Sequence, residues 1–207
     1  MMARAIWGSS RLLLPNSTAP MEGLILLLGL AIWLGATYSR FAKLRQLIRQ
    51  SWVDIDVELK RRHELIPNLV STAEGYVTNE RELFTRVSEL LDQSAARHAS
   101  AASQAEDESD LMHEMRGLFA VVEGYPELKA NAQFLTLQAQ LAETEDRLAA
   151  ASGLFNGKVR AMNLLREGFP SGIVGSMFGF GANSLFELDM TAQRIIPRSV
   201  PLSSSDP

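Results

Sequence analysis

The sequence predicts an all-α protein: an N-terminal single transmembrane helix followed by an elongated antiparallel bundle of long helices. One almost uncharged apolar run, Met21–Tyr38, is long enough to cross a bilayer. Beyond it, apolar residues recur at steps of three and four, the spacing of one helix face, and no alternating strand pattern is present. Alanine, leucine, glutamate and glutamine are abundant in the middle of the chain, where glycine and proline are few, which also favours helix.

The totals restrict the class of function. The chain has 207 residues, enough for one ordinary domain with extensions. Its 20 basic and 24 acidic residues give a net charge of −4, whereas nucleic-acid binding usually needs a marked basic excess. It contains no cysteine, so disulfides, thiolate metal sites and cysteine nucleophiles are excluded.

The predicted span is charged only near its N-terminal edge, at Glu22. Pro20 suits a first helical turn, where its missing N–H costs nothing. A buried core helix and a cleaved signal peptide are the alternative interpretations, but Gly35-Ala36-Thr37 is a poor match to a small-x-small cleavage site. Aromatic residues near the far end suit the membrane interface. The residues that we expect in the bilayer include Leu24, Leu28, Ile32, Trp33 and Tyr38.

The charges around the span predict its orientation. Basic residues are more frequent after it than before it, so the positive-inside rule places the C-terminal side in the cytoplasm. Residues 1–20 form an N-terminal extension with loop chemistry, and Met21 is a second candidate start codon. A start at Met21 removes both preceding arginines and strengthens this orientation. The charges are Arg40, Lys43, Arg45 and Arg49 after the span, and Arg4 and Arg11 before it.

We expect residues 39–186 to form the helical bundle. Its first helix has two acid-first pairs at i,i+4, Asp56 with Lys60 and Glu58 with Arg62, which favour a helix surface. Pro67 either kinks this helix or opens the next one. Asn79-x-x-Glu82 resembles a capping signal near a break. The apolar stripe comprises Leu44, Ile48, Trp52, Ile55, Leu59, Ile66, Leu69 and Val70.

Residues 92–110 are small and polar, so we expect a flexible connection there, either irregular or helical in part. A third helix is expected from Asp110 to Val122, ended by Gly124-Tyr125-Pro126. The longest helix is expected from Glu127 to Gly168, roughly 60 Å at 1.5 Å per residue. Such a rod is stable only when it packs against neighbours, which favours an elongated antiparallel bundle.

Phe169-Pro170-Ser171 is expected to stop this helix. The phenylalanines that follow, Phe178, Phe180 and Phe186, either fold back over the end of the bundle or contact a membrane or partner. Residues 187–207 are expected to be a disordered tail.

No known catalytic or metal motif is complete. His63-Glu64 and His113-Glu114 each begin an HExxH motif, but Pro67 and Gly117 stand where the second histidine is required. No phosphate-binding loop, nucleophile elbow or dinucleotide fingerprint is present, and no serine is convincingly paired with a histidine. The long helix has no histidine for a di-metal site. We therefore expect no enzyme activity, no cofactor and no metal.

Polar residues in the predicted helices have ordinary structural explanations. Glu143, Glu145 and Asp146 are expected to cap or to pair with Arg147. The run Lys60-Arg61-Arg62 suits anionic headgroups, but flanking acids favour a solvated, salt-bridged face. Asn131, Asn156 and Asn163 stand near the packed stripe, where buried polar groups must be paired.

Several strings resemble the LemA family of proteins. Ser51–Arg62 with Leu65–Val70 is similar to its first signature, and Glu123–Asn131 with Phe134-Leu135 is similar to its second. Glu143–Arg147, Phe155-Asn156 and Phe169-Pro170-Ser171 resemble the third. The similarity runs from about Met21 to Phe186. His63 and Phe155 depart from the pattern, because the family usually has tyrosine or a similar residue at the first position and often tyrosine at the second.

The resemblance implies a single-pass protein of the bacterial cytoplasmic membrane, with a cytoplasmic helical bundle and no known enzymatic activity. Its motif residues are expected to be structural or to bind partners. They are Trp52, Asp56, Lys60, Arg61, Arg62, Pro67, Asn68, Tyr125, Pro126, Lys129, Asn131, Phe134, Gln138, Glu143, Glu145, Asn156, Asn163, Phe169 and Pro170.

The tether, the elongated bundle and the absence of catalytic motifs predict a membrane-anchored scaffold or adaptor for an unidentified protein partner. The alternative is a self-assembling structural protein that organises membrane patches, which requires a homo-oligomer. Nucleic acid is not an expected partner.

Overall fold

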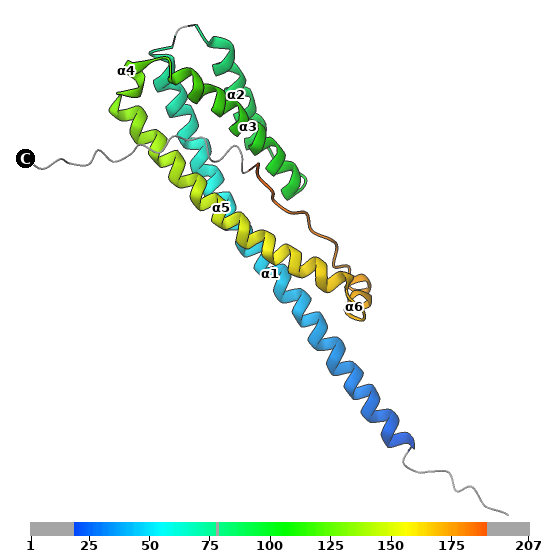
Figure 1. The fold of residues 1–207 in the computed structure, drawn as a ribbon. Helices are drawn as coiled ribbons and strands as arrows, with labels where there is room; N and C mark the ends of the chain where they lie inside the picture. Colours follow the sequence, from blue (N-terminus) through cyan, green and yellow to red (C-terminus); the bar gives the residue numbers. More distant parts are fainter. Residues whose placement is uncertain (1–18, 78, 190–207) are drawn as a thin grey trace, which may run out of the picture.

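The computed structural model describes residues 19–77 and 79–189, and within them every regular element is a helix (Figure 1). The all-α prediction and the long apolar N-terminal helix are confirmed. The predicted extension before Ala19 and most of the predicted tail lie outside the described residues. The elements are α1 (Ala19–Glu74), α2 (Arg81–Ala95), α3 (Ala101–Val122), α4 (Pro126–Lys129), α5 (Ala132–Glu167) and α6 (Ser171–Met177).

The longest element is α1, which has 56 residues and is about 84 Å long. It joins the apolar segment to the bundle without interruption, and it passes through Pro67 to Glu74. The expectation that the stretch after Glu127 forms the longest helix was therefore wrong. Pro67 lies inside α1 and does not open a new helix. Ile66, before it, and Leu69 and Val70, after it, are buried in the same apolar cluster.

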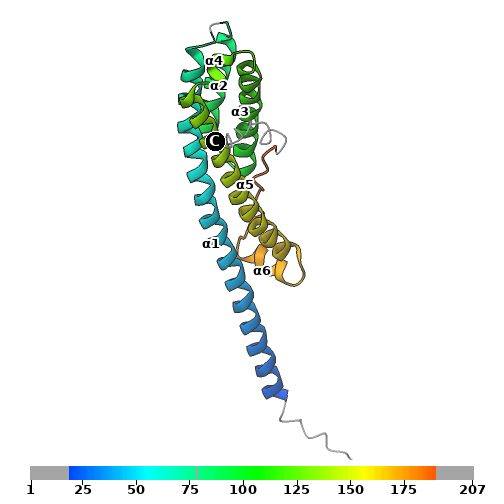
Figure 2. The same cartoon turned by 60° about the vertical axis from the view of Figure 1, so that its left-hand side comes forward.

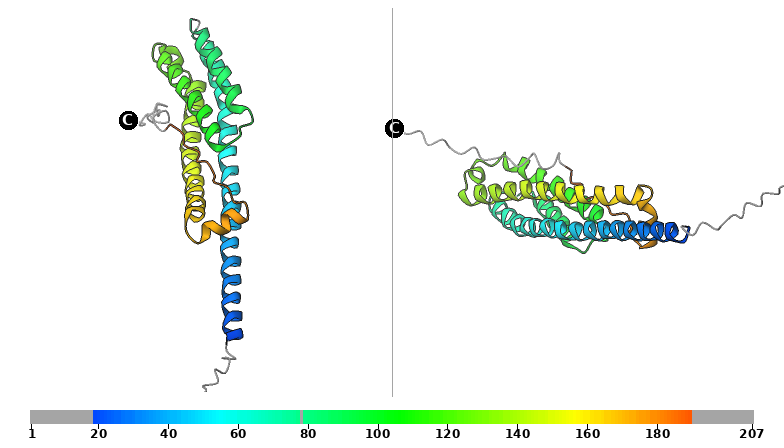
Figure 3. Two further views of the ribbon diagram at one scale, coloured as in Figure 1. Left: turned by 90° about the vertical axis from the view of Figure 1, so that its right-hand side faces the viewer. Right: turned by 90° about the horizontal axis from the view of Figure 1, so that it is seen from below.

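α5 lies alongside α1 and runs back toward the apolar segment, as two perpendicular views show (Figures 1 and 3). It has 36 residues and begins later than expected. The stretch from Glu127 divides because Asn131 interrupts it: its Oδ1 accepts a hydrogen bond from the Phe134 backbone N–H at 2.9 Å and caps α5. The short helix α4 precedes this cap.

The expected flexible connection at 92–110 is largely helical. α2 continues to Ala95 and α3 already begins at Ala101, so only 96–100 connect them. Ser100 caps α3 and forms a reciprocal pair with Ser103. The small and acidic residues of this segment have enough helical propensity to form a helix when one face packs against the bundle. Ala105 and Glu108 are buried on that face. The capping signal at Asn79 was also wrong, since Glu80 occupies that position without a side-chain bond.

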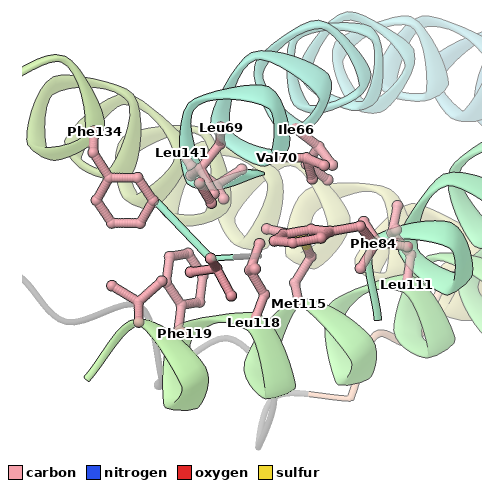
Figure 4. Close-up of a cluster of buried hydrophobic side chains, with 14 of the residues drawn as sticks. Ile66, Leu69, Val70, Phe84, Leu111, Met115, Leu118, Phe119, Phe134 and Leu141 are labelled. Carbon is pink, nitrogen blue, oxygen red and sulfur yellow. The ribbon is translucent and has the colours of Figure 1, made fainter. Parts of the chain in front are cut away.

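Two apolar clusters form the core. The upper cluster joins the end of α1 to α2, α3 and the start of α5 (Figure 4). The lower cluster joins the middle of α1 to the end of α5, α6 and the chain that follows. In the lower cluster Trp52 lies with its ring centroid 5.3 Å from that of Phe155 and 5.6 Å from that of Phe186.

The chain after α6, residues 179–189, runs back up the bundle; we call it the C-terminal strap (Figures 1 and 2). Its backbone pairs with asparagine side chains of α5. Asn156 Nδ2 donates to the Phe186 carbonyl and Asn156 Oδ1 accepts from the Phe186 N–H, both at 2.8 Å. Asn163 makes the same two bonds to Asn183, at 3.0 and 3.1 Å. The segment with Phe180 and Phe186 therefore folds back along the bundle, which is the first of the two arrangements expected for it.

Candidate functional site

The first candidate feature is the apolar start of α1. Among the described residues, only α1 is long and apolar enough to cross a membrane. Every residue from Met21 to Trp33 is exposed, and so large an apolar surface is costly in water. Among the predicted span residues, Leu24, Leu28 and Ile32 are 60%, 56% and 73% exposed. The segment is consistent with membrane anchoring.

The second feature is a cluster of charges in the centre of the bundle. Arg62 of α1, Glu108 of α3 and Glu145 of α5 are buried together, and we call them the buried charge cluster. The Arg62 guanidinium binds Glu145 through two hydrogen bonds, one of them from Nε to Oε1 at 2.6 Å. Its Nη1 donates to Glu108 Oε2 at 2.7 Å. Such fork-like pairing suits arginine and fixes three helices in one register.

Two further polar side chains form hydrogen bonds with the carboxylate of Glu108. Its Oε1 accepts from His63 Nε2 at 2.8 Å and from Gln104 Nε2 at 3.0 Å. Gln104 Nε2 also donates to the Ser94 carbonyl at the end of α2, at 2.8 Å. The four long helices, α1, α2, α3 and α5, therefore all contribute to this network.

Burial and pairing act in opposite directions on these groups. Burial alone would lower the pKa of Arg62, but the carboxylates of Glu145 and Glu108 outweigh it and raise that pKa. Burial alone would raise the pKa of Glu108, but the hydrogen bond from His63 and the charge of Arg62 hold that pKa below its ordinary value. Both shifts favour the charged forms of Arg62 and Glu108.

This arrangement corrects the expectations for two predicted surface groups. Arg62 is 0% exposed, so it lies neither on a solvated face nor near lipid, and it pairs with Glu145 and Glu108 rather than with Glu58. The period of α1 turns Arg62 inward while Lys60 and Arg61 stay at the surface. Glu145 likewise pairs across the bundle and not with Arg147.

Other expected pairs are present. Lys60 Nζ lies 2.7 Å from Asp56 Oδ2, and Arg147 Nη2 donates to Glu143 Oε1 at 2.5 Å. Asn131 both caps α5 and donates from Nδ2 to the Tyr76 hydroxyl at 2.9 Å. All three suspected asparagines are therefore paired.

A serine lies close to a histidine, which sequence inspection did not reveal. Ser94 Oγ is 3.2 Å from His63 Nε2. In a nucleophilic triad the acid orients one ring nitrogen and the other nitrogen activates the serine. Here Glu108 and Ser94 both meet Nε2, and the Ser94 hydroxyl donates to the Leu91 carbonyl at 3.0 Å. The arrangement does not prepare Ser94 for attack.

An open cavity of about 890 Å³ adjoins this network. α1, the 96–100 connection and the C-terminal strap line it, and His63, Ser94 and Gln104 form part of its wall. Lys60 and His63 are paired as described, and His98 Nε2 lies 2.6 Å from Asp107 Oδ2. Within residues 19–77 and 79–189, no group of three or more His, Asp and Glu side chains is placed to hold a metal ion.

A family model described as "LemA family" matches residues 51–199, more than half of the chain. The chain belongs to the LemA family. The matched stretch begins after the apolar segment and includes the buried charge cluster and the asparagines that hold the strap. A search of curated proteins found no match.

The LemA motif residues separate into two groups. Arg62, Phe134, Gln138, Glu145 and Asn156 are buried, and Trp52, Tyr125, Asn131 and Asn163 are partly buried, so their places are explained by packing and pairing. The second group is exposed and comprises Lys60, Pro67, Asn68, Pro126, Lys129, Glu143, Phe169 and Pro170; Asp56 and Arg61 are partly buried and lie beside it at the surface.

Sequence inspection missed Glu108, which completes the charge cluster. It lies in the segment interpreted as a flexible connection, so no helical periodicity drew attention to it. The signal available was the alanine-rich composition around it, which is compatible with a helix that packs closely.

Proposed function

We propose that this LemA protein is a membrane-anchored, non-enzymatic scaffold or adaptor that presents its helical surface to partner proteins at the bacterial cytoplasmic membrane. The observation that carries the proposal is the continuity of α1. One helix contains both the apolar segment, Met21–Tyr38, and the longest side of the bundle. A membrane that holds this segment therefore also holds the bundle.

The junction between anchor and bundle supports a fixed presentation. Phe41 is 0% exposed and belongs to the lower core cluster, directly after the predicted span. The helix has no break or glycine between Gly35 and the end of its lower core contacts at Leu59. A flexible linker would let the domain sample many orientations, whereas a continuous packed helix restricts them.

Exposed apolar side chains on the bundle offer contact points for proteins. Val53 and Val57 lie one turn apart on α1 and are 57% and 55% exposed. Leu154 and Leu164 of α5 are 63% and 68% exposed. Single exposed residues of this kind are ordinary, so a neighbouring pair on one helix is the more informative feature.

The absence of enzymatic activity is part of the proposal. The geometry at Ser94 and His63 does not match nucleophilic catalysis. Two ion pairs lie beside the cavity, Lys60 with Asp56 and His98 with Asp107. These contacts favour a structural role for the groups.

In-cell photo-crosslinking tests the proposal. A photoreactive residue replaces Val57, Arg86 or Leu154 on three different helices, all exposed, and the products are identified by mass spectrometry. A matched control carries the probe at Leu148, which is 0% exposed and is expected to give no intermolecular product.

A discrete product with a different protein supports the adaptor. Products with other copies of the chain alone, at all three positions, replace the adaptor by the self-assembling membrane organiser. If the exposed positions crosslink no more than Leu148 does, both hypotheses are rejected.

A further inference from the structure

An exposed apolar face lies at the base of the bundle, on and beside α6. It comprises Phe169, Ile173, Met177 and Phe178, which are 89%, 60%, 68% and 53% exposed; we call it the α6 apolar face. Ile173 and Met177 are four residues apart on α6, so they lie on one side of it, and Phe169 and Phe178 flank the helix. The opposite side, with Val174 at 1% exposed, packs into the lower core cluster. This short segment therefore has apolar residues on its outward side as well as on its inward side.

α6 packs against the C-terminal end of the predicted span. The ring centroids of Phe178 and Tyr38 lie 4.9 Å apart, and those of Phe180 and Phe41 also lie 4.9 Å apart. Gly175 faces Phe41 so closely that an added Cβ would lie 3.0 Å from its Cζ. α6 is the lowest part of the bundle in two views, and beyond it α1 continues alone (Figures 1 and 2).

The contact extends below Tyr38, into the apolar run itself. Thr37 is only 6% exposed, and Leu34 packs against the cluster that contains Val174 and Phe180. The bare part of α1, Met21–Trp33, has 13 residues and is roughly 20 Å long. A bilayer's hydrocarbon core is about 30 Å thick. A membrane that covers the whole predicted span therefore reaches the level of α6.

The charges at this end agree with a membrane surface. No charged residue occurs between Glu167 and Glu187, a stretch that includes all of α6. On α1 no acidic residue follows Glu22 until Asp54. The charges nearest the base are Arg40, Lys43 and Arg45 on α1 and Arg166 with Glu167 on α5, a basic excess that favours anionic headgroups.

We propose that the α6 apolar face is a second membrane contact, which inserts into the boundary between headgroups and acyl chains beside α1. The inference rests on the proposed function, because it requires α1 to cross the membrane. With two contacts, the bilayer fixes the rotation of the bundle about α1 as well as its distance from the surface. An interfacial helix of this kind lies with its apolar side about 5–10 Å into the boundary.

Depth measurement in vesicles tests this inference on the full chain. The chain has no cysteine, so Ile173→Cys gives a single site for an environment-sensitive fluorophore. The protein is reconstituted in phosphatidylcholine–phosphatidylglycerol vesicles that contain lipids spin-labelled at a shallow or a deep acyl position. We expect loss of fluorescence at Ile173 with both lipids, and a larger loss with the shallow label. Leu28→Cys reports the span. Arg86→Cys, at a side chain that is 61% exposed, reports the bundle surface on α2, a helix at the other end of the bundle from α6 (Figure 1).

The controls separate failure of the inference from failure of the anchor. Quenching at Leu28 without quenching at Ile173 overturns the α6 contact and leaves the anchor intact. No quenching at Leu28 rejects the membrane anchor, and with it both proposals. Quenching at Arg86 equal to that at Ile173 overturns the inference, because the whole bundle would then lie on the lipid.

A second variant checks that insertion depends on the apolar face. In Ile173→Cys with Met177→Asp, the label is expected to lose its quenching by the shallow lipid, because a charge at the boundary is costly. Met177 is exposed, so the bundle is expected to keep its unfolding midpoint. Unchanged quenching in this variant overturns the inference.

Discussion

The buried charge of the Arg62 guanidinium is balanced by the carboxylates of Glu108 and Glu145, and each of these carboxylates has Arg62 as its cationic partner. All three groups are withdrawn from water, so their mutual attraction must offset a large desolvation cost. The hydrogen bonds to His63 and Gln104 help, because they satisfy lone pairs of Glu108 that burial would otherwise leave unpaired. The cluster therefore specifies how α1, α3 and α5 align more than it adds to stability.

Removal of Arg62 is expected to be strongly destabilising. Arg62→Met leaves Glu108 and Glu145 buried without their cation, which typically costs about 3–5 kcal/mol. Urea unfolding of the detergent-solubilised protein, followed by far-UV circular dichroism, measures the loss. Arg61→Met is the matched control, because Arg61 lies at the surface, 3.9 Å from Glu143, and is expected to change stability by less than about 1 kcal/mol. Equal losses in the two variants would contradict the burial argument.

The lowered pKa of Glu108 predicts acid sensitivity of the bundle. Its carboxyl takes up a proton less readily in the folded state than in the unfolded state, so folding is favoured while Glu108 is ionised. This contribution is present above the ordinary value of 4.5 and is lost as pH falls below it, through the folded-state pKa.

Urea midpoints from neutral pH down to acid pH measure this effect. Glu108→Gln is less stable than the unmodified chain at neutral pH, and the difference is expected to shrink as pH falls through the window. A difference that stays constant or grows would contradict the assigned pKa direction.

At the scale of elements, the C-terminal strap shows how an irregular segment can be ordered. It makes no helix, and its backbone groups would be unpaired on the bundle without partners. Asn156 and Asn163 lie seven residues apart on α5. Their side-chain amides form the hydrogen bonds with the strap backbone that a neighbouring β-strand would form in a sheet. Phe186, 0% exposed beside Trp52, adds apolar contact at the same place.

Substitution of Asn156 is expected to release this strap. Asn156→Ala leaves the Phe186 N–H and carbonyl without partners, at about 1–3 kcal/mol for each buried group. Hydrogen exchange of amides around Phe186 is expected to accelerate more than exchange in the upper core cluster. The matched control is Asn68→Ala, because the Asn68 side chain is exposed and donates to the Glu64 carbonyl within its own helix. Unchanged protection at Phe186 in Asn156→Ala would show that apolar packing alone holds the strap.

At the scale of the whole molecule, the features are ordered along α1. The bare apolar segment stands at one end, α6 packs beside α1 near Phe41 (Figures 1 and 3), and the buried charge cluster joins α1 at Arg62, after the lower core contacts end at Leu59. The opposite end holds α4 and the tight turns around it. This order places the exposed apolar segment at one end of the molecule and, under the proposed function, leaves the long side of the bundle to partner proteins.

The orientation of this axis is predicted by the basic residues after the span. Arg86→Cys supplies one thiol on the bundle surface of a chain that otherwise has none. A membrane-impermeant maleimide is expected to label it only after the cytoplasmic membrane is opened. Labelling in cells with only the outer barrier opened would place the bundle on the opposite side.

The sequence by itself determined the helical class, the apolar span and the family, because all three depend on local periodicity, length and contiguous motifs. It also predicted local pairs such as Asp56 with Lys60, whose distance follows from helix geometry alone. Only the tertiary structure decided that Arg62 is buried while Arg61 is not, because helix rotation depends on which face has neighbours. It likewise decided that Glu108 meets His63, 45 positions apart, and that the strap pairs with α5. Contacts between distant segments arise from packing of whole helices, and no local pattern in the chain records which side chains they bring together.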